Sequence, residues 1–361
     1  NKSDQYKKIL RKIDVVSTIQ SEHQFIPSAI IFQQTLKNKI KVYSRNGHGT
    51  RMSIRKFSSF SKRYTFTADE TEKLFKFIYK ERRHLASKLG YKLIKKRLAG
   101  NWKAYFEIER IGGHGDKKNY SKKELCKILN WDINKPIVTI FSHSLIDGNY
   151  RNGPRIFKDN LTWLRETLFN IQDIDKFNWM IKPHPNDGYY NFAKTNTIKE
   201  YNEIVGKYDH VKIVPNDLSS ISVSKIVNAI VTSHGTASLE YACMGVPAIT
   251  EGRTAYSYLN INYWAKTKKK YFYYLNNIDK LNRPSKIQVD KARTYAYIDE
   301  VVIKVKNNLI PNYDTTNKVN ENKFYQDCYK LIMKYSHNSD KFKEMAFNQF
   351  KKNSPQSINL N

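Results

Sequence analysis

Short apolar runs alternate with amphipathic stretches through the C-terminal two-thirds of the chain. The runs are rich in Val and Ile and are bounded by polar residues, a pattern typical of buried strands. The predicted strands are 136–142, 177–181, 211–214, 226–232 and 246–249. The amphipathic stretches between them predict helices over 156–170, 189–205, 218–225 and 237–244. Regular alternation of strand and helix predicts an α/β fold with a parallel sheet covered on both faces.

The N-terminal part has a similar but shorter pattern. A charged helix is predicted over 1–12, and strands over 13–19 and 40–43 flank a helix that starts near Pro27 and ends near Leu36. These elements make one βαβ unit. A long helical stretch over 68–96 interleaves aromatic and basic residues, and 323–350 predicts a second long amphipathic region.

The polar, glycine-rich run 110–118 predicts a linker between two domains. We therefore expect a first domain over 1–115, a second over 116–315, and a helical extension over 316–361 that packs back on the first domain. The chain starts in a polar segment without an initiator Met, and we expect further sequence upstream.

Charge and cysteine content narrow the class of protein. The 63 Lys and Arg residues against 33 Asp and Glu give a formal charge of +30, which attracts polyanions without choosing among them. The three cysteines form no CxxC pair, which argues against a structural zinc site and suits a reducing cytosol. No apolar run reaches the roughly 18 residues of a membrane-spanning helix. We expect a cytoplasmic protein, with its basic surface toward acidic glycan or inner-leaflet lipid.

Polar turns follow three predicted strands, at 143–149, 182–185 and 233–236. Because the carboxyl ends of parallel strands meet at one sheet edge, these turns should converge there. The third turn and the start of the next helix predict an anion site, with Glu240 placed to accept the hydroxyls of a ribose. The alternative is an ordinary strand-to-helix turn in which Glu240 pairs locally.

Individual residues in these turns have candidate roles. His184 stands between two prolines and follows Lys182, so both are placed to bind a phosphate. Asp147 is the carboxylate of its turn and is the candidate base or nucleophile. The alternatives are a turn histidine and an Asx-turn before Gly148. In the first domain, four residues lie at the ends of predicted strands: Glu22, His23, Asn46 and Arg51. Glu22 and His23 are the candidate catalytic residues among them. Each of the four could equally be a solvated loop residue.

The segments FSHSLIDGNY, WMIKPHP and VTSHGTASLEYACMGVPAI resemble, in this order, the nucleotide-binding half of GT-B glycosyltransferases. The resemblance is strongest to the capsule and surface polysaccharide synthesis family that includes bacterial β-Kdo transferases. Bacterial GT-B sialyltransferases similarly pair an Asp-Gly motif with a His-Pro motif. The resemblance implies two Rossmann-like domains that face a cleft, and a CMP-activated acidic sugar as donor.

Carried over by residue, the resemblance assigns His184 and Pro185 to the motif that binds the CMP phosphate. It assigns Asp147 to proton or nucleophile chemistry, with inversion of the anomeric centre in the first case and retention in the second. The turn with which the family binds phosphate corresponds here to Ser233, Gly235, Thr236 and Ser238, and His234 lies within this turn. Glu240 falls where GT-B enzymes bind ribose, and Arg253 adds positive charge.

The resulting expectation is a glycosyltransferase that moves Kdo or a related acidic sugar from a CMP donor onto a capsule or lipopolysaccharide glycan. It needs no cofactor, and no metal motif accompanies the site, so the reaction is expected to be metal-independent. One alternative is a CDP-polyol phosphotransferase of teichoic-acid type, and another is an epimerase-like GT-B protein. A third is a nucleic-acid-binding protein, suggested by the charge and the face over 75–84 but without a binding motif; nucleic acid is therefore not an expected partner.

Overall fold

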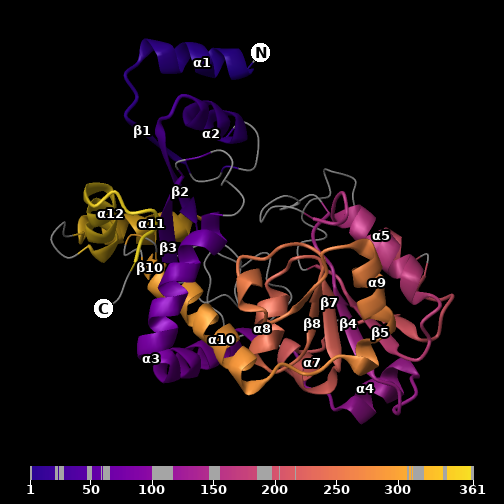
Figure 1. The fold of residues 1–361 in the computed structure, drawn as a ribbon. Coiled ribbons are helices and arrows are strands. Elements are labelled where there is room, and N and C mark those ends of the chain that lie inside the picture. The colour runs from indigo at the N-terminus through magenta and orange to yellow at the C-terminus, as the bar shows by residue number, and fades with distance from the viewer. Residues whose placement is uncertain are drawn as a thin grey trace. The chain divides into compact units, whose positions relative to one another are not determined.

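The computed structural model describes two compact units of the chain (Figure 1). The first is formed by the two ends of the chain, 1–73 and 298–361, and the second by 74–102 and 110–297. This division places 74–99 with the second unit and 298–306 with the first, which differs from the boundaries expected from the glycine-rich run. The described residues are 2–20, 23, 28–46, 51–57, 59, 66–99, 117–145, 155–184, 197–202, 204–215, 217–306, 309, 311, 321–335 and 340–358.

A six-stranded sheet forms the centre of the second unit, and all of its strand pairs are parallel. Its strands are β4 (Ile137–Phe141), β5 (Asn178–Lys182), β6 (Val211–Ile213), β7 (Ala229–Thr232), β8 (Ala248–Thr250) and β9 (Tyr263–Trp264). Every residue of β7 and β8 is buried, because helices cover both faces of a parallel sheet. The predicted α/β class and the first five strands are confirmed, whereas β9 was not predicted.

The strand order is β6-β5-β4-β7-β8-β9. The chain therefore runs outward from β4 to β6, crosses back to β7 beside β4, and runs outward again to β9. This is the doubly wound arrangement, and its direction reverses between β4 and β7. Ligands of such sheets bind in the crevice at the carboxyl ends of the strands at this reversal.

Several helices of the second unit begin at side-chain caps. Asp159 accepts from the Thr162 N–H at the start of α5, and Ser121 forms a reciprocal cap with Glu124 at the start of α4. The helices are α4 (Lys122–Leu129), α5 (Asn160–Ile171), α6 (Thr197–Asn202), α7 (Ser220–Ile226), α8 (Ala237–Cys243), α9 (Lys268–Asn276) and α10 (Lys286–Tyr297), with short 3₁₀ turns at Ser257–Leu259 and Ile278–Lys280. Of the helix predicted over 189–205, α6 is the part described as helical, and 204 and 205 lie in a turn.

Two tryptophans anchor the core of the second unit. Trp163 and Trp179 are fully buried, and the indole N–H of Trp163 donates to the Tyr271 hydroxyl at 2.8 Å. Thr167 lies 2.8 Å from the same hydroxyl, so the buried phenol is satisfied from two sides. Burial raises the pKa of Tyr271 above its usual range.

The long helix α3 (Phe66–Leu98) contains a kink at Arg82, where φ is −138° and ψ is 22°. In its second half, Gly90 touches the backbone of α10. A Cβ atom built at Gly90 would lie 1.9 Å from the Arg293 carbonyl oxygen. Glycine is therefore the residue that permits this helix–helix approach. Ser87 adds a hydrogen bond to Asp290 at 2.8 Å across the same contact.

The first unit contains a mixed four-stranded sheet in the order β1-β2-β3-β10. The parallel pair β1 (Ser17–Gln20) and β2 (Lys41–Asn46) with α2 (Ser28–Lys37) is the predicted βαβ unit, preceded by α1 (Lys2–Lys12). The strands β3 (Arg51–Phe57) and β10 (Val305–Lys306) are antiparallel to their neighbours and were not predicted. A π-helix, Ile298–Val302, precedes β10.

The C-terminal segment packs on this sheet, as predicted. It contains α11 (Glu321–Met333) and α12 (Lys341–Lys351). Met345 of α12 joins Tyr43, Ile54 and Val305 in one buried cluster. The Ser357 hydroxyl accepts from the Ile54 N–H at 3.1 Å, which ties the end of the segment to β3. Among the described helices, none combines the length and apolarity that a membrane crossing requires.

Candidate functional site

Three histidines follow three neighbouring strands of the second unit at the same offset. His143, His184 and His234 each lie two residues beyond the last residue of β4, β5 and β7. These strand ends are in register, because Phe141 of β4 pairs with Lys182 of β5 and with Thr232 of β7. The parallel register therefore gathers the three imidazoles at the carboxyl edge where the chain direction reverses. Figure 1 shows β4, β5 and β7 in this sheet.

The rings of His143 and His234 stack, with centroids 4.5 Å apart and planes 17° apart. The backbone N–H of His234 donates to His143 Nε2 at 3.4 Å, and Thr232 Oγ1 lies 3.3 Å from the same nitrogen. Burial lowers the pKa of His143 well below its usual range, and the nearby His234, His184 and Arg155 lower it further. His143 is therefore neutral at neutral pH.

Behind His234 lies a buried ion pair between Arg155 and Glu251. Their side chains are 4% and 0% exposed, and Arg155 Nε and Nη2 both donate to Glu251 Oε1. Ser233 Oγ donates to Glu251 and lies 2.8 Å from both Arg155 Nη2 and His234 Nδ1. Arg155 also donates to Asn160 Oδ1 at 2.8 Å, so the guanidinium is held on two sides. A chain of polar groups thus connects the ion pair to the His234 ring.

Sequence reasoning missed Arg155 and Glu251. Glu251 directly follows the buried strand β8, and a carboxylate at such a strand end was a readable signal. Arg155 carries no local signal, because its bridge to Gly252 joins segments far apart in the chain.

Close backbone packing explains the glycines of the turn. A Cβ atom at Gly235 would lie 2.9 Å from Thr232 Oγ1 and 3.0 Å from His143 Nε2. One at Gly252 would lie 3.1 Å from His234 Cβ. Both positions therefore need glycine to let the histidines sit against the turn.

Two other residues of the predicted phosphate turn differ in exposure. The Ser238 hydroxyl is buried, where it donates to the Gly235 carbonyl at 2.9 Å and lies 2.7 Å from the Tyr256 hydroxyl. In this structure it orders the turn. Thr236 is exposed at the start of α8, and Arg253 follows Gly252 at the same edge.

Glu240 and Lys182 have partners that were not predicted. Glu240 is buried, and its Oε1 lies 3.1 Å from Arg97 Nε of α3. Lys182 donates to Ser220 Oγ at 2.8 Å, and burial lowers the pKa of its ammonium to about 8, with a further contribution from Lys117. A ribose role for Glu240 and a phosphate role for Lys182 stay predictions.

Other candidates lie elsewhere in the chain. Asp147, Pro185 and Glu22 are outside the described residues. His23 belongs to the first unit, where Nδ1 lies 3.3 Å from Ser44 Oγ and the ring packs between Phe32 and Phe57. Within the described residues, no group of three or more His, Cys, Asp or Glu side chains is arranged to hold a metal ion.

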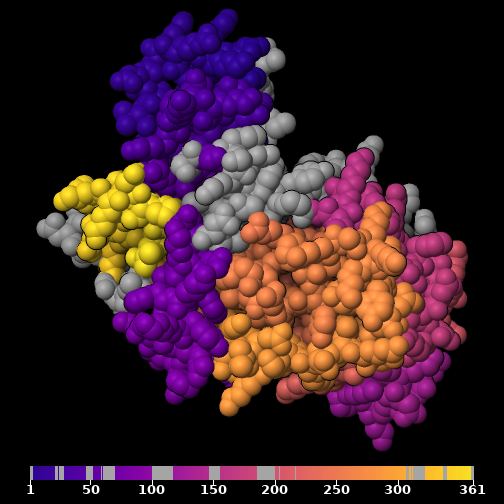
Figure 2. Space-filling model, viewed as in Figure 1, coloured from indigo at the N-terminus to yellow at the C-terminus, as the bar shows by residue number. Residues whose placement is uncertain are grey.

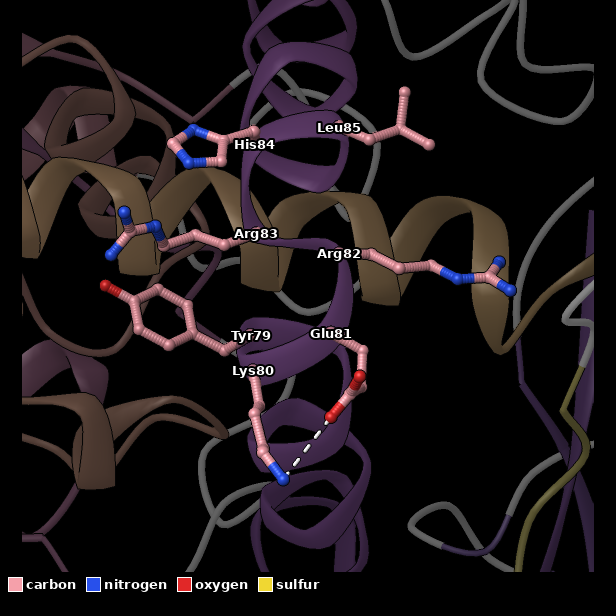
Figure 3. Close-up of a pocket in the computed structure, with 7 residues that line it drawn as sticks. All are labelled: Tyr79, Lys80, Glu81, Arg82, Arg83, His84 and Leu85. Atoms are coloured by element: carbon pink, nitrogen blue, oxygen red, sulfur yellow. Dashed lines mark ion pairs between the residues drawn. The ribbon is translucent and has the colours of Figure 1, made fainter.

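A separate hollow of about 800 Å³ lies at the kink of α3 and is lined by Tyr79 to Leu85 (Figure 3). Figure 3 shows Tyr79, Arg83 and His84 on one side of the helix, and Arg82 and Leu85 on the other. The side chains therefore diverge instead of enclosing a ligand. Just before the kink, Phe75 is buried and stacks on Tyr79, with ring centroids 5.2 Å apart. This part of the aromatic and basic stretch thus has the ordinary division into core and solvated sides.

No protein-family model matches the sequence, and no curated protein matches it. The structure is similar to the β-Kdo 2,4 transferase of Thermosulfurimonas dismutans KpsC, at 9% identity over 88% of this chain and 86% of that one, with a TM-score of 0.43. The β-Kdo 2,7 transferase of the same protein is similar at 11% identity over 91% of this chain and 89% of that one, with a TM-score of 0.43. The UDP-GlcNAc 2-epimerase from Neisseria meningitidis is similar at 10% identity over 82% of this chain and 79% of that one, with a TM-score of 0.35. These values describe a loose likeness in the course of the chain.

Proposed function

We propose that the second unit binds a nucleotide sugar and that the protein is a glycosyltransferase of GT-B type. The observation that carries this proposal is the row of three histidines in register at the reversal point of a doubly wound sheet. Imidazoles donate to phosphate oxygens, and this sheet edge is where such folds bind nucleotides. The three motifs that resemble GT-B enzymes occupy the same strand ends.

The proposed donor is Kdo or a related acidic sugar linked to CMP, and the acceptor is an anionic capsule or lipopolysaccharide glycan. A single phosphate needs little neutralisation, so Lys182, His184 and Arg253 serve without a metal or cofactor. Glu240 is proposed to accept the ribose hydroxyls. The Arg97 contact uses Oε1, and a carboxylate has about four acceptor positions, so Arg97 orients Glu240 without saturating it.

Nucleotide binding is the direct test of this proposal. In a thermal-shift screen of CMP, CDP, UDP and GDP, the cytidine nucleotides are expected to give the largest rise in Tm. A ligand at a hundredfold excess over Kd stabilises the folded state by about 2.7 kcal/mol. The His184→Ala variant should need more CMP for the same shift, because it loses a phosphate donor.

Two outcomes of the screen would contradict the proposal at different levels. An unchanged Tm with all four nucleotides would contradict the proposed nucleotide-sugar site itself. A preference for UDP or GDP would remove the CMP donor and keep the site. Turnover of CDP-glycerol in place of CMP-Kdo would instead establish the polyol phosphotransferase.

The proposal includes contact of α11 with an anionic lipid surface. Four apolar side chains form an exposed stripe at helical spacing, 55–68% exposed: Tyr325, Tyr329, Ile332 and Met333. The lysines of this segment and the +30 charge of the chain complement acidic head groups. Figure 2 shows the C-terminal segment, in yellow, at the molecular surface.

The lipid contact predicts selective binding to vesicles. The protein should sediment with phosphatidylglycerol vesicles and much less with phosphatidylcholine vesicles. Ile332→Ser combined with Met333→Ser is expected to weaken this binding about tenfold, because two side chains no longer enter the interface. Phe169→Ser removes an exposed apolar side chain of the second unit and serves as the control. Equal binding to both vesicles, or unchanged binding of the double variant, would contradict the proposed lipid contact of α11.

A further inference from the structure

The hydrogen bonds of Ser233 determine which nitrogen of His234 carries a proton. A serine hydroxyl has one hydrogen and two lone pairs. Glu251 pairs with the Arg155 guanidinium and accepts from Ser233 Oγ, so the hydroxyl hydrogen points to Glu251. Arg155 can only donate, and it occupies one lone pair at 2.8 Å. The remaining lone pair faces His234 Nδ1 at 2.8 Å, so this nitrogen must be the donor. His234 therefore holds a proton on Nδ1, so a second proton on this ring can be added only at Nε2.

His143 holds the opposite role in the stacked pair. Its Nε2 receives the backbone N–H of His234, which can only donate, so Nε2 is unprotonated and the neutral ring carries its proton on Nδ1. Two imidazolium rings with centroids 4.5 Å apart would repel strongly. Because His143 is neutral, a positive charge on this pair belongs to His234.

We infer that His234 takes up a proton at Nε2 when a nucleotide phosphate binds at the strand ends, with Ser233 and Glu251 as positioning residues. The proton comes from solvent and returns to solvent when the nucleotide leaves, and no covalent bond of the protein changes. The inference rests on the proposed nucleotide site and adds its regulation by pH.

Among the described residues, the charged groups that the structure places near His234 are either paired with one another or basic. Arg155 and Glu251 form a neutral pair behind the ring. His143 is neutral. Lys182 and His184 from the end of β5, and Arg253 after β8, are further basic groups of this edge. Gly252 approaches the His234 ring with backbone alone. A bound phosphate supplies the negative charge that favours the imidazolium.

Histidine-selective ¹⁵N NMR tests the inference directly, with peaks assigned by His→Gln variants. In the free protein, His143 and His234 are both expected in the Nδ1–H tautomer. Addition of CMP at pH 7.5 should move His234 Nε2 from the unprotonated to the protonated shift range and leave His143 Nε2 unprotonated. A proton gained by His184 instead, or by no histidine while CMP binds, would overturn the inference.

The free-protein spectrum separates this inference from the proposed function. If CMP does not bind, the proposed function and the coupled proton uptake both fail, and the tautomers still show whether Ser233 positions His234. If CMP binds without a new proton on His234, the coupling alone fails.

Serine variants test the positioning role. Ser233→Ala is expected to release His234 from the Nδ1–H tautomer, and Ser233→Thr should restore it because the hydroxyl returns. Ser224→Ala is the matched control, since this buried serine bonds the Ile221 carbonyl away from the strand ends. An unchanged His234 tautomer in folded Ser233→Ala would overturn the role of Ser233.

The pH dependence of CMP affinity gives an independent readout. Above about pH 7 the CMP phosphate is doubly ionised, because its second pKa is about 6. The affinity should then fall by up to tenfold per pH unit, which is the limit for uptake of one proton. His234→Gln is expected to abolish this slope, whereas His184→Gln should weaken binding and keep it. A slope that persists in His234→Gln would refute the inference.

Discussion

An Asp147→Asn variant is expected to transfer sugar at least a hundredfold more slowly than the parent chain while it binds CMP equally well. The change removes a proton acceptor or nucleophile and preserves the size of the side chain. General acid–base catalysis contributes about 10² to 10⁴ in rate, so the loss should exceed any effect on substrate binding. The measurement is product formation from CMP-Kdo in excess EDTA, where the parent chain is expected to remain fully active.

Asp173→Asn provides the control for this experiment. Asp173 is an exposed carboxylate just after α5, and its loss should leave transfer unchanged. The anomeric configuration of the product then separates the two roles of Asp147, because a base gives inversion and a nucleophile gives retention. Full transfer by Asp147→Asn would exclude both roles and would turn attention to the histidines of the strand ends.

A Glu251→Ala variant is expected to destabilise the second unit by about 3–5 kcal/mol. The change leaves the Arg155 guanidinium, which is 4% exposed, without its carboxylate. It also removes the acceptor of the Ser233 hydroxyl and of the Ile156 N–H. Chemical denaturation followed by tryptophan fluorescence measures the loss, because Trp163 and Trp179 lie in the core of this unit.

Glu166→Ala is the matched control for the buried pair. Glu166 forms an ion pair with Lys268 at 2.6 Å, but the two side chains are 35% and 47% exposed. Its loss should cost at most about 1 kcal/mol, because solvent screens exposed charges. The double variant Arg155→Met with Glu251→Leu removes both charges and should recover most of the stability. An effect of Glu251→Ala no larger than that of the control would mean that solvent reaches Arg155.

The strands of the second unit were predictable because of how such sheets are buried. A strand covered on both faces must be apolar along its whole length, and this produced the runs that became β4, β5, β6, β7 and β8. Three strands were not predicted, because they lack such an apolar run. β9 and β10 are two residues each, too short for a periodic pattern, and β3 is a mixed strand, RMSIRKF, with Arg and Lys at three positions.

The candidate site was predictable only in part. Polar residues after buried strands pointed to His184 and to the turn at His234, because parallel strand ends share an edge. Nothing local indicated that Arg155 would pair with Glu251, that Lys182 would turn to Ser220, or that Arg97 would reach Glu240. Each of these contacts joins segments whose approach depends on strand register and helix packing.

By itself, the sequence determined the α/β class, the order of the parallel strands along the chain and the polar turns at their ends. These features follow from the local spacing of apolar residues, which indicates both burial and the period of a strand or helix. The tertiary structure alone decided that His143 is neutral, that His234 is bonded through Ser233 to a buried ion pair, and that Gly90 admits the backbone of α10. The reason is physical: proton positions and close contacts depend on distances of a few ångströms between groups far apart in the chain, and only the packed fold sets those distances.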